Sequence, residues 1–174
     1  MLDIDLTLIR KISNFPIAGV QFKDITPLLA DSKNFEKIIN ECSSRSISSQ
    51  YIAGIEARGF IFASAVAHAN KKGFIPLRKS GKLPGPVEKQ IYKLEYGEAA
   101  LEIHRDLYQT DASVTIVDDV LATGGTAIAA IKLCQKVKLH VDSIIFLMEI
   151  PALGGRSQIS EQFPDLQISV LLAE

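Results

Sequence analysis

The sequence predicts a single α/β domain whose mainly parallel central sheet is flanked by helices. The 174 residues suit one compact domain with a sizeable core. Strand-like and helix-like segments alternate along the chain, which favours a parallel sheet with helices on both faces. Several strand-like segments, such as YIAGI (51–55) and SVTIV (113–117), are continuous apolar runs, as expected for strands buried on both faces.

The N-terminal elements are predicted from local patterns. Residues 4–13 are expected to form a short amphipathic helix. Residues 19–29 are expected to be irregular, because Pro27 interrupts any long strand. A helix then begins after Asp31 or Ser32, either of which can cap its first turn. The apolar stripe of this helix, at helical spacing, consists of Phe35, Ile38, Ile39 and Cys42.

Beyond this helix, strands and helices alternate. Strands are predicted over residues 51–55, 73–79, 113–117, 143–149 and 167–172. Helices are predicted over residues 60–70 and 127–137. Residues 90–96 and 100–106 alternate between apolar and polar side chains, which predicts a strand pair around Gly97. Residues 80–89 contain two glycines and two prolines and predict the clearest loop of the chain.

The composition excludes several classes of partner. A net charge of −1 and a pI of about 6.3 give no global field to recruit nucleic acid or an anionic membrane. No apolar run approaches the roughly twenty residues that span a bilayer, and acidic residues stand where a signal peptide is basic. The two cysteines are expected to be buried free thiols, and the three histidines lack metal-ligand spacing. We therefore expect a cytoplasmic protein that holds no transition metal of its own.

Three predicted loops follow predicted strands. They are EARG (56–59), SGKLPG (80–85) and DDVLATGGT (118–126). In a parallel sheet with helices on both faces, ligands bind where such loops leave the carboxyl ends of the strands. We therefore expect these three loops to form one site.

The third loop belongs to the stretch VTIVDDVLATGGTA at 114–127. Its glycine-rich turn opens a helix, so backbone N–H groups and the helix dipole would favour an anion such as phosphate. It has neither the lysine of a Walker A loop nor the spacing G-x-G-x-x-G. Asp118 and Asp119 precede the turn, and carboxylates accept hydrogen bonds from ribose hydroxyls. The pattern predicts a ribose 5-phosphate site; the alternative is a solvated acidic turn with a Gly-Gly corner.

This stretch resembles the phosphoribosyl-pyrophosphate motif of the type I phosphoribosyltransferases. Four further segments resemble, in order, the members of that family that use adenine: FPIAGVQFKDITPLL, GIEARGFIFASAVA, PLRKSGKLPGPV and KLEYGEAALEIHRD. The resemblance implies the type I phosphoribosyltransferase fold as one domain over residues 1–174. It would have a small N-terminal hood (about 1–30), a core (about 31–174) and a mobile lid (about 79–90).

The resemblance also implies an activity. Family members of this kind join adenine to 5-phosphoribosyl 1-pyrophosphate and release AMP and pyrophosphate. Magnesium is expected to enter bound to the pyrophosphate of the substrate, in keeping with its preference for few protein ligands. The relatives are generally homodimers, so a homodimer is expected here.

Site residues follow from the same resemblance. The ribose 5-phosphate is expected to contact Asp118, Asp119, Ala122, Thr123, Gly124, Gly125 and Thr126. The pyrophosphate is expected to contact Arg58, Arg78, Lys79 and Lys82. Adenine is expected to stack on Phe22 beside Lys23, which stands where many relatives have arginine, and Glu95 is expected to handle its proton.

Other interpretations remain open at this point. The same ribose phosphate motif serves transferases that use guanine, xanthine or pyrimidines. The fold can also serve a sugar-phosphate-sensing regulator without turnover, but such a protein needs a DNA-binding module, and no basic patch provides one. Among single residues, Arg58 could be a surface ion pair, Phe22 a core residue and Glu95 a strand-edge charge.

Overall fold

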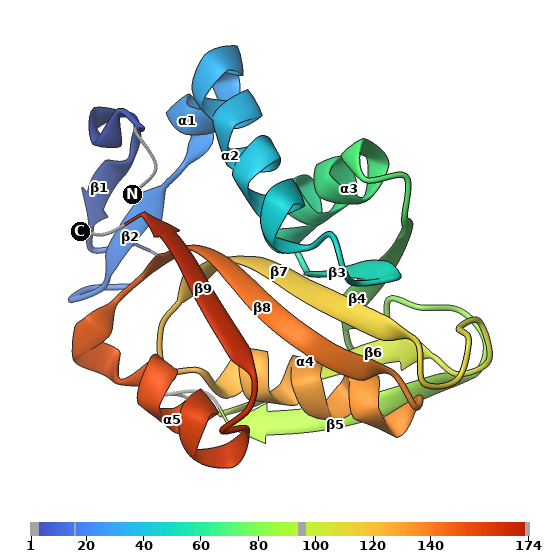
Figure 1. Ribbon diagram of the computed structural model, residues 1–174. Coiled ribbons are helices and arrows are strands. Elements are labelled where there is room, and N and C mark those ends of the chain that lie inside the picture. The colour runs from blue at the N-terminus through green and yellow to red at the C-terminus, as the bar shows by residue number, and fades with distance from the viewer. Residues whose placement is uncertain (1–3, 16, 94–96, 173–174) are drawn as a thin grey trace.

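A seven-stranded sheet forms the centre of the computed structural model, which describes residues 4–15, 17–93 and 97–172 (Figure 1). Its strands are β3 (Tyr51–Ile55), β4 (Gly73–Lys79), β5 (Val87–Lys93), β6 (Glu98–His104), β7 (Ser113–Leu121), β8 (His140–Glu149) and β9 (Gln167–Leu172). Their order across the sheet is β5-β6-β4-β3-β7-β8-β9. The five strands from β4 to β9 in this order pair in parallel, while β6 pairs antiparallel with β4 and β5. The predicted α/β class with a mainly parallel sheet is confirmed.

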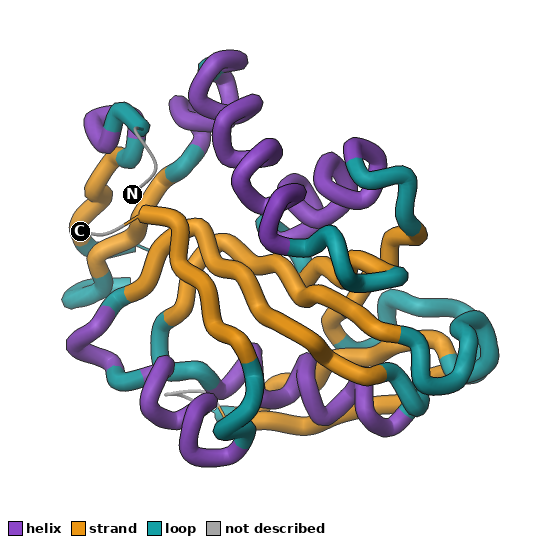
Figure 2. The backbone as a smooth tube through the Cα atoms, in the orientation of Figure 1, coloured by secondary structure: helices purple, strands orange, loops and turns teal. Residues whose placement is uncertain are grey.

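Helices cover both faces of this sheet (Figures 1 and 2). One face carries α2 (Ser32–Arg45) and α3 (Gly59–Ala69), and the other carries α4 (Gly125–Lys136) and α5 (Gly155–Gln162). Alternate residues of one strand therefore enter different cores. In β7, Val114 and Ile116 pack into the cluster on the α4 side, whereas Val117 packs into the cluster on the α3 side.

The N-terminal residues form a small unit of a two-stranded sheet and two short helices, whose apolar side chains pack into the core on the α3 side. Its elements are a 3-10 turn (Leu6–Leu8), β1 (Arg10–Ser13), β2 (Gln21–Asp24) and α1 (Thr26–Ala30). The helix predicted over 4–13 is therefore wrong, since its second half is a strand. Antiparallel pairing places Arg10 opposite Asp24, and their side chains form an ion pair. This pairing, between residues 14 positions apart in sequence, outweighs the local helical pattern.

Residues 19–29 are also more regular than predicted. Pro27 does not interrupt an element there; it stands in the first turn of α1. A proline is tolerated at that position, because the first N–H groups of a helix have no partner within the helix.

The middle of the chain follows the prediction closely. Asp31 caps α2 by accepting a hydrogen bond from the Asn34 N–H, and Ile38, Ile39 and Cys42 are buried along the predicted stripe. The predicted pair of strands around Gly97 is present as β5 and β6.

Two boundaries differ from the prediction, and two elements are additional to it. The loop predicted over 80–89 ends at Pro86, so the expected lid segment includes the first residues of β5. Strand β7 continues past Val117 to Leu121, because its ladder with β8 extends to the pair Leu121 and Glu149. The helix α5 and the 3-10 turn before it (Pro151–Leu153) were not predicted. None of the helices in the described ranges is long and apolar enough to cross a membrane.

Candidate active site

The carboxyl ends of β3, β4 and β7 lie at one edge of the sheet and bring the three predicted loops together. Ile55 at the end of β3 pairs with Leu77 of β4, and Gly54 pairs with Val117 of β7. The turn after β3, the loop after β4 and the acidic end of β7 therefore begin side by side.

The loop after β7 forms a small cradle at the start of α4. Gly124 caps this helix with a φ of +85°, a conformation that residues with a side chain rarely adopt. A cavity of about 80 Å³ opens at the loop, far below the roughly 300–1,000 Å³ of a site that encloses a whole small molecule. The predicted residues among those lining it are Asp118, Ala122, Thr123, Gly124 and Thr126. Gly125 is the first residue of α4. The cavity has the position and size expected of a seat for a single phosphoryl group.

A second pair of glycines, Gly154 and Gly155 at the start of α5, lies next to this cradle, and Gly155 packs against its backbone. A Cβ atom added to Gly155 would lie 2.2 Å from the carbonyl oxygen of Ala122 and 2.8 Å from the backbone nitrogen of Gly124. A Cβ atom on Gly124 would in turn lie 2.8 Å from the Gly155 carbonyl oxygen. The two backbones approach so closely that only glycine fits at either position.

The two predicted aspartates differ in exposure, since Asp118 is half-buried and Asp119 is buried. Asp118 accepts a hydrogen bond from the N–H of Asp119 at 2.9 Å, and Asp119 is buried with 5% of its surface exposed. Burial raises the pKa of Asp118 well above its ordinary value, and the neighbouring Asp119 carboxylate adds to the effect. Burial also raises the pKa of Asp119, against the opposing influence of the Arg58 guanidinium.

Arg58, which precedes α3, joins the acid pair to the N-terminal unit. Its Nε lies 2.6 Å from Oδ2 of Asp119, an ion pair in which Oδ2 accepts no hydrogen bond within the described part of the chain. Its guanidinium also donates to the Lys23 carbonyl oxygen at 2.9 Å and lies 4.8 Å from the centre of the Phe22 ring. Phe22 is half-buried and meets Phe15 edge to face at 5.1 Å. Residues predicted for three different parts of the substrate are thus brought into one chain of contacts.

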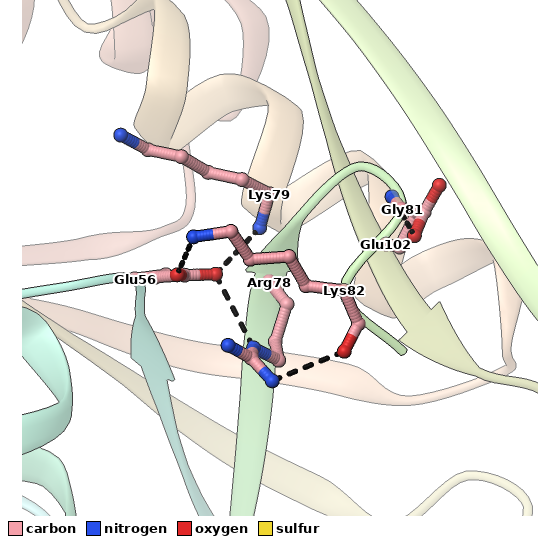
Figure 3. Close-up of polar contacts among 6 residues, drawn as sticks. All are labelled: Glu56, Arg78, Lys79, Gly81, Lys82 and Glu102. Atoms are coloured by element: carbon pink, nitrogen blue, oxygen red, sulfur yellow. Dashed lines mark hydrogen bonds and ion pairs between the residues drawn. The ribbon is translucent and has the colours of Figure 1, made fainter. Parts of the chain in front are cut away.

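Glu56, the first residue after β3, collects donors from the end of β4 and the loop that follows it (Figure 3). Its carboxylate accepts from the Lys79 N–H at 2.9 Å, from Arg78 Nε at 3.3 Å and from Lys82 Nζ at 2.7 Å. Burial alone would raise the pKa of Glu56, but the Lys82, Lys79 and Arg78 contacts outweigh it and lower the pKa to about 2. The Lys79 side chain points away from this cluster (Figure 3).

Glu102, in β6, holds the base of the same loop. It is buried, and it accepts from the Ser80 hydroxyl at 2.6 Å and from the Gly81 N–H at 2.8 Å. The Ser80 hydrogen bond lowers the pKa of Glu102 below its ordinary value despite the opposing effect of burial. The loop over residues 80–86 is therefore anchored to the sheet at its first residues.

Comparison with known proteins identifies the family. A phosphoribosyl transferase domain model matches residues 25–161. A curated adenine phosphoribosyltransferase of Roseobacter denitrificans is 46% identical over 153 residues, which cover 87% of this chain and 87% of the relative. The chain belongs to the adenine phosphoribosyltransferase family. An adenine phosphoribosyltransferase of Francisella tularensis is 44% identical over 163 residues, which cover 91% of this chain and 93% of the relative.

Solved structures of adenine phosphoribosyltransferases share the fold. The enzyme of Thermoanaerobacter pseudethanolicus superposes with a TM-score of 0.88 at 43% identity and covers 95% of both chains. The Saccharomyces cerevisiae enzyme, in a complex with an imino-altritol bisphosphate and adenine, gives a TM-score of 0.88 at 34% identity, again over 95% of both chains. The predicted type I phosphoribosyltransferase fold is confirmed. The comparisons give no support to the alternative transferases or to the sensing regulator.

The predicted and the observed sites of this adenine phosphoribosyltransferase family member differ in several residues. Glu95, the predicted catalytic residue, lies outside the described residues. Within the described ranges, no three or more His, Cys, Asp and Glu side chains are grouped so that they could hold a metal ion. Glu56, Glu102 and Gly155 were not predicted as site residues. Glu56 had a visible signal, since it stands two positions before Arg58 in EARG.

Proposed function

We propose that this member of the family transfers the phosphoribosyl group of 5-phosphoribosyl 1-pyrophosphate to adenine, with the subsites divided along the sheet edge as predicted. The observation that carries the proposal is the continuity of the edge. A phosphate-sized cradle, an acid pair, a cation cluster and an aromatic ring lie along it, and Arg58 contacts both Asp119 of the acid pair and the ring.

The sugar phosphate would be held by the cradle and the acid pair. Backbone N–H groups at the start of α4 would donate to the 5′-phosphate, with the Thr123 and Thr126 hydroxyls beside them. Asp118 and Asp119 would accept from the ribose hydroxyls. Their raised pKa values support this role, because hydroxyl donors and nearby cations would stabilise the charged form that burial now disfavours.

The pyrophosphate would lie against the cations of the β3 turn and the β4 loop. Arg58, Arg78 and Lys82 already lie at this edge through their contacts with Asp119 and Glu56, and Lys79 follows Arg78 at the end of β4. A guanidinium can contact two phosphate oxygens at once. Magnesium bound with the pyrophosphate would add positive charge to the leaving group. Of the acids at this edge, Asp118 and Asp119 would fit its oxygen-ligand chemistry, because the Glu56 carboxylate is already paired with Arg78 and Lys82.

Adenine would bind beside Phe22, with Lys23 contributing mainly through its backbone. Phe22 is only half-buried, which supports a stacking surface over a core role, and the Lys23 carbonyl already serves as an acceptor for Arg58. Glu95 would take or hold the proton that adenine loses as the new bond forms.

The reaction then follows from charge. As the bond from C1 to pyrophosphate breaks, the ribose ring becomes more positive and the leaving group more negative. The cations at the edge would stabilise the leaving group, and the cradle and acid pair would fix the sugar for attack by adenine from the opposite side. Loop 80–86 would exclude water that could otherwise hydrolyse the activated sugar.

The proposal includes a cytoplasmic homodimer. The exposed apolar side chains of Ile61 and Phe74 support a partner surface, since they stand on the adjacent elements α3 and β4. The unpaired, buried Cys42 and Cys134 suit a reducing compartment. Sedimentation at micromolar concentration should give twice the 19.0 kDa of one chain. A monomer at that concentration would contradict the dimer without affecting the proposed reaction.

Formation of AMP from a panel of bases tests the function. With magnesium and 5-phosphoribosyl 1-pyrophosphate, adenine should be favoured over hypoxanthine and guanine by at least about a hundredfold in kcat/KM. A pocket made for an amino group leaves buried partners unpaired when a keto purine enters, which can cost on the order of 10⁴ in rate. Comparable rates with hypoxanthine would overturn the assignment.

A further inference from the structure

Two of the predicted pyrophosphate cations are already paired with one carboxylate of the protein, Glu56. Of the four, Arg78 and Lys82 both form ion pairs with Glu56. Arg78 also donates from Nη1 to the Lys82 carbonyl oxygen at 3.0 Å, so the three residues form a closed ring of contacts (Figure 3). Any anion that uses these cations must therefore compete with Glu56.

The contacts of Glu56 differ in how easily they can be exchanged. The Glu56 side chain is 8% exposed, the Arg78 side chain 33% and the Lys82 side chain 50%. Backbone contacts fix Glu56 itself, since its N–H donates to the Leu77 carbonyl oxygen and its carboxylate accepts from the Lys79 N–H. An ion pair made by a half-exposed lysine is weak in water, because solvent screens it and the long side chain loses freedom in forming it. Lys82 is the exchangeable member of the ring.

We propose that Glu56 is a positioning residue that holds Lys82 over the pyrophosphate subsite in the free enzyme and yields it to the substrate. The inference rests on the proposed function and adds a competing anion to it. When pyrophosphate arrives, Lys82 moves from one carboxylate charge to a group that carries several negative charges. Glu56 keeps its bonds to the Lys79 N–H and to Arg78, so the end of β4 stays in place.

A purely structural role for Glu56 would not need Lys82. The loop over residues 80–86 is anchored at its base by Glu102, through the Ser80 hydroxyl and the Gly81 N–H. The Glu56 contact lies farther along the loop and reaches it through a flexible side chain. The loop thus has fixed attachments at Ser80, at Gly81 and at the Lys82 carbonyl, and the contact of the Lys82 side chain is the one that can be released.

Binding of magnesium pyrophosphate to Glu56→Gln tests the proposal. Glutamine keeps an acceptor for the Lys79 N–H but loses the charge that competes for Lys82. Calorimetry should show pyrophosphate bound about two- to fivefold more tightly than by the parent, the range that one half-exposed ion pair supplies. The matched control is Glu41→Gln in α2, which removes a carboxylate paired with Arg45 far from this edge and should leave the affinity unchanged.

A double-mutant cycle with Lys82→Met identifies the competing cation. If Glu56 acts by holding Lys82, the gain from Glu56→Gln should fall below about twofold once residue 82 is uncharged. A gain of full size in the Lys82→Met background would overturn the proposal, because it would reflect the general removal of a negative charge. Unchanged or weaker binding by a folded Glu56→Gln protein would overturn it as well.

Trypsin reports on Lys82 in the free protein. Cleavage after Lys82 should be faster in Glu56→Gln than in the parent or in Glu41→Gln. If thermal unfolding shows that Glu56→Gln does not fold, Glu56→Asp takes its place, since its shorter side chain withdraws the carboxylate from Lys82. An unchanged rate of cleavage in that variant would refute the proposal.

The two proposals fail in different ways. If the parent itself neither forms AMP nor binds magnesium pyrophosphate, the proposed function fails. If the parent does both but Glu56 and Lys82 are not coupled in the cycle, the proposed function stands and the inference alone fails.

Discussion

Gly155→Ala should damage the phosphate cradle although Gly155 is not itself a predicted ligand residue. The added Cβ would lie 2.2 Å from the Ala122 carbonyl oxygen and 2.8 Å from the Gly124 nitrogen. Both neighbours are backbone atoms, so no side chain can rotate out of the way. Real Cβ contacts essentially never fall below 3.0 Å, so the start of α5 and the cradle must separate by about 0.8 Å or more.

Two effects of different size follow from that displacement. Overpacking of this kind costs about 1–3 kcal/mol of stability. A shift of about 1 Å in groups that position a substrate can cost on the order of 10²-fold in rate. We therefore expect kcat/KM for 5-phosphoribosyl 1-pyrophosphate to fall by about 10- to 100-fold, with weaker binding of the sugar phosphate as the main cause.

Gly154→Ala is the matched control. Gly154 has a φ of +68°, so alanine is strained there, but a Cβ atom would find no neighbour within 4 Å. This variant should lose about 1–2 kcal/mol of stability and keep the affinity of the parent for the sugar phosphate. Calorimetric titration of both variants with 5-phosphoribosyl 1-pyrophosphate, after thermal unfolding has confirmed that they fold, separates the two effects. Parent-like affinity in Gly155→Ala would refute the idea that this glycine supports the cradle.

Three further predictions concern the acids. Asp118→Asn and Asp119→Asn should each weaken binding of the sugar phosphate by about 1.5–3 kcal/mol, through loss of a charged acceptor; normal binding in calorimetry would assign the acids another role. Burial raises the pKa of Asp118 in the folded protein above its ordinary value of 3.8. The protonated Asp118 side chain therefore makes its full contribution to folding stability below pH 3.8. That contribution is lost as the pH rises through the raised pKa of the folded state. The Tm of Asp118→Asn minus the Tm of the parent should therefore be larger at about pH 8 than at about pH 4. The same difference in Tm at both pH values would contradict the raised pKa. Glu95→Gln should lower kcat by about 10²–10⁴-fold with both substrates still bound, if Glu95 is the general base. An increase in KM for adenine with kcat unchanged, checked by a single-turnover measurement, would show instead that Glu95 only orients the base.

The sheet and the cradle could be predicted because their signals are local. The strands at 51–55 and 113–117 are apolar runs that only a doubly covered sheet can bury. The turn at Gly124 needs a positive φ, and glycine followed by a helix-forming run marks that need within a few residues. Neither inference required knowledge of a distant partner.

The N-terminal unit could not be predicted, because distant partners decide its structure. The segment at 4–13 has a helical pattern, but the residues from Arg10 onward pair with β2 instead. A proline such as Pro27 is compatible both with the end of a strand and with the first turn of a helix, so the residue alone does not predict which of the two is formed. The same limit explains why β7 was predicted to end at Val117, since β8 supplies the ladder that carries it to Leu121.

The unpredicted site residues share this dependence on distant partners. Glu56 was visible as an acid in a turn, but its partners lie on the next strand and in the loop beyond it. Glu102 faces away from the apolar neighbours that mark β6 as a strand, and its partners are in a loop about twenty residues earlier. Gly155 belongs to a visible Gly-Gly pair whose purpose depends on a loop about thirty residues before it.

The pairing of charges along the edge also explains why composition gave no sign of a site for a polyanion. We expect a cleft that binds a pyrophosphate to add net positive charge to a small protein, yet this chain has a net charge of −1. In the free protein, Arg58 is balanced by Asp119, and Glu56 balances part of the charge of Arg78 and Lys82. Part of the positive charge at this edge is therefore held in ion pairs with the protein's own carboxylates. Charges paired in this way give little long-range field to attract polyanions.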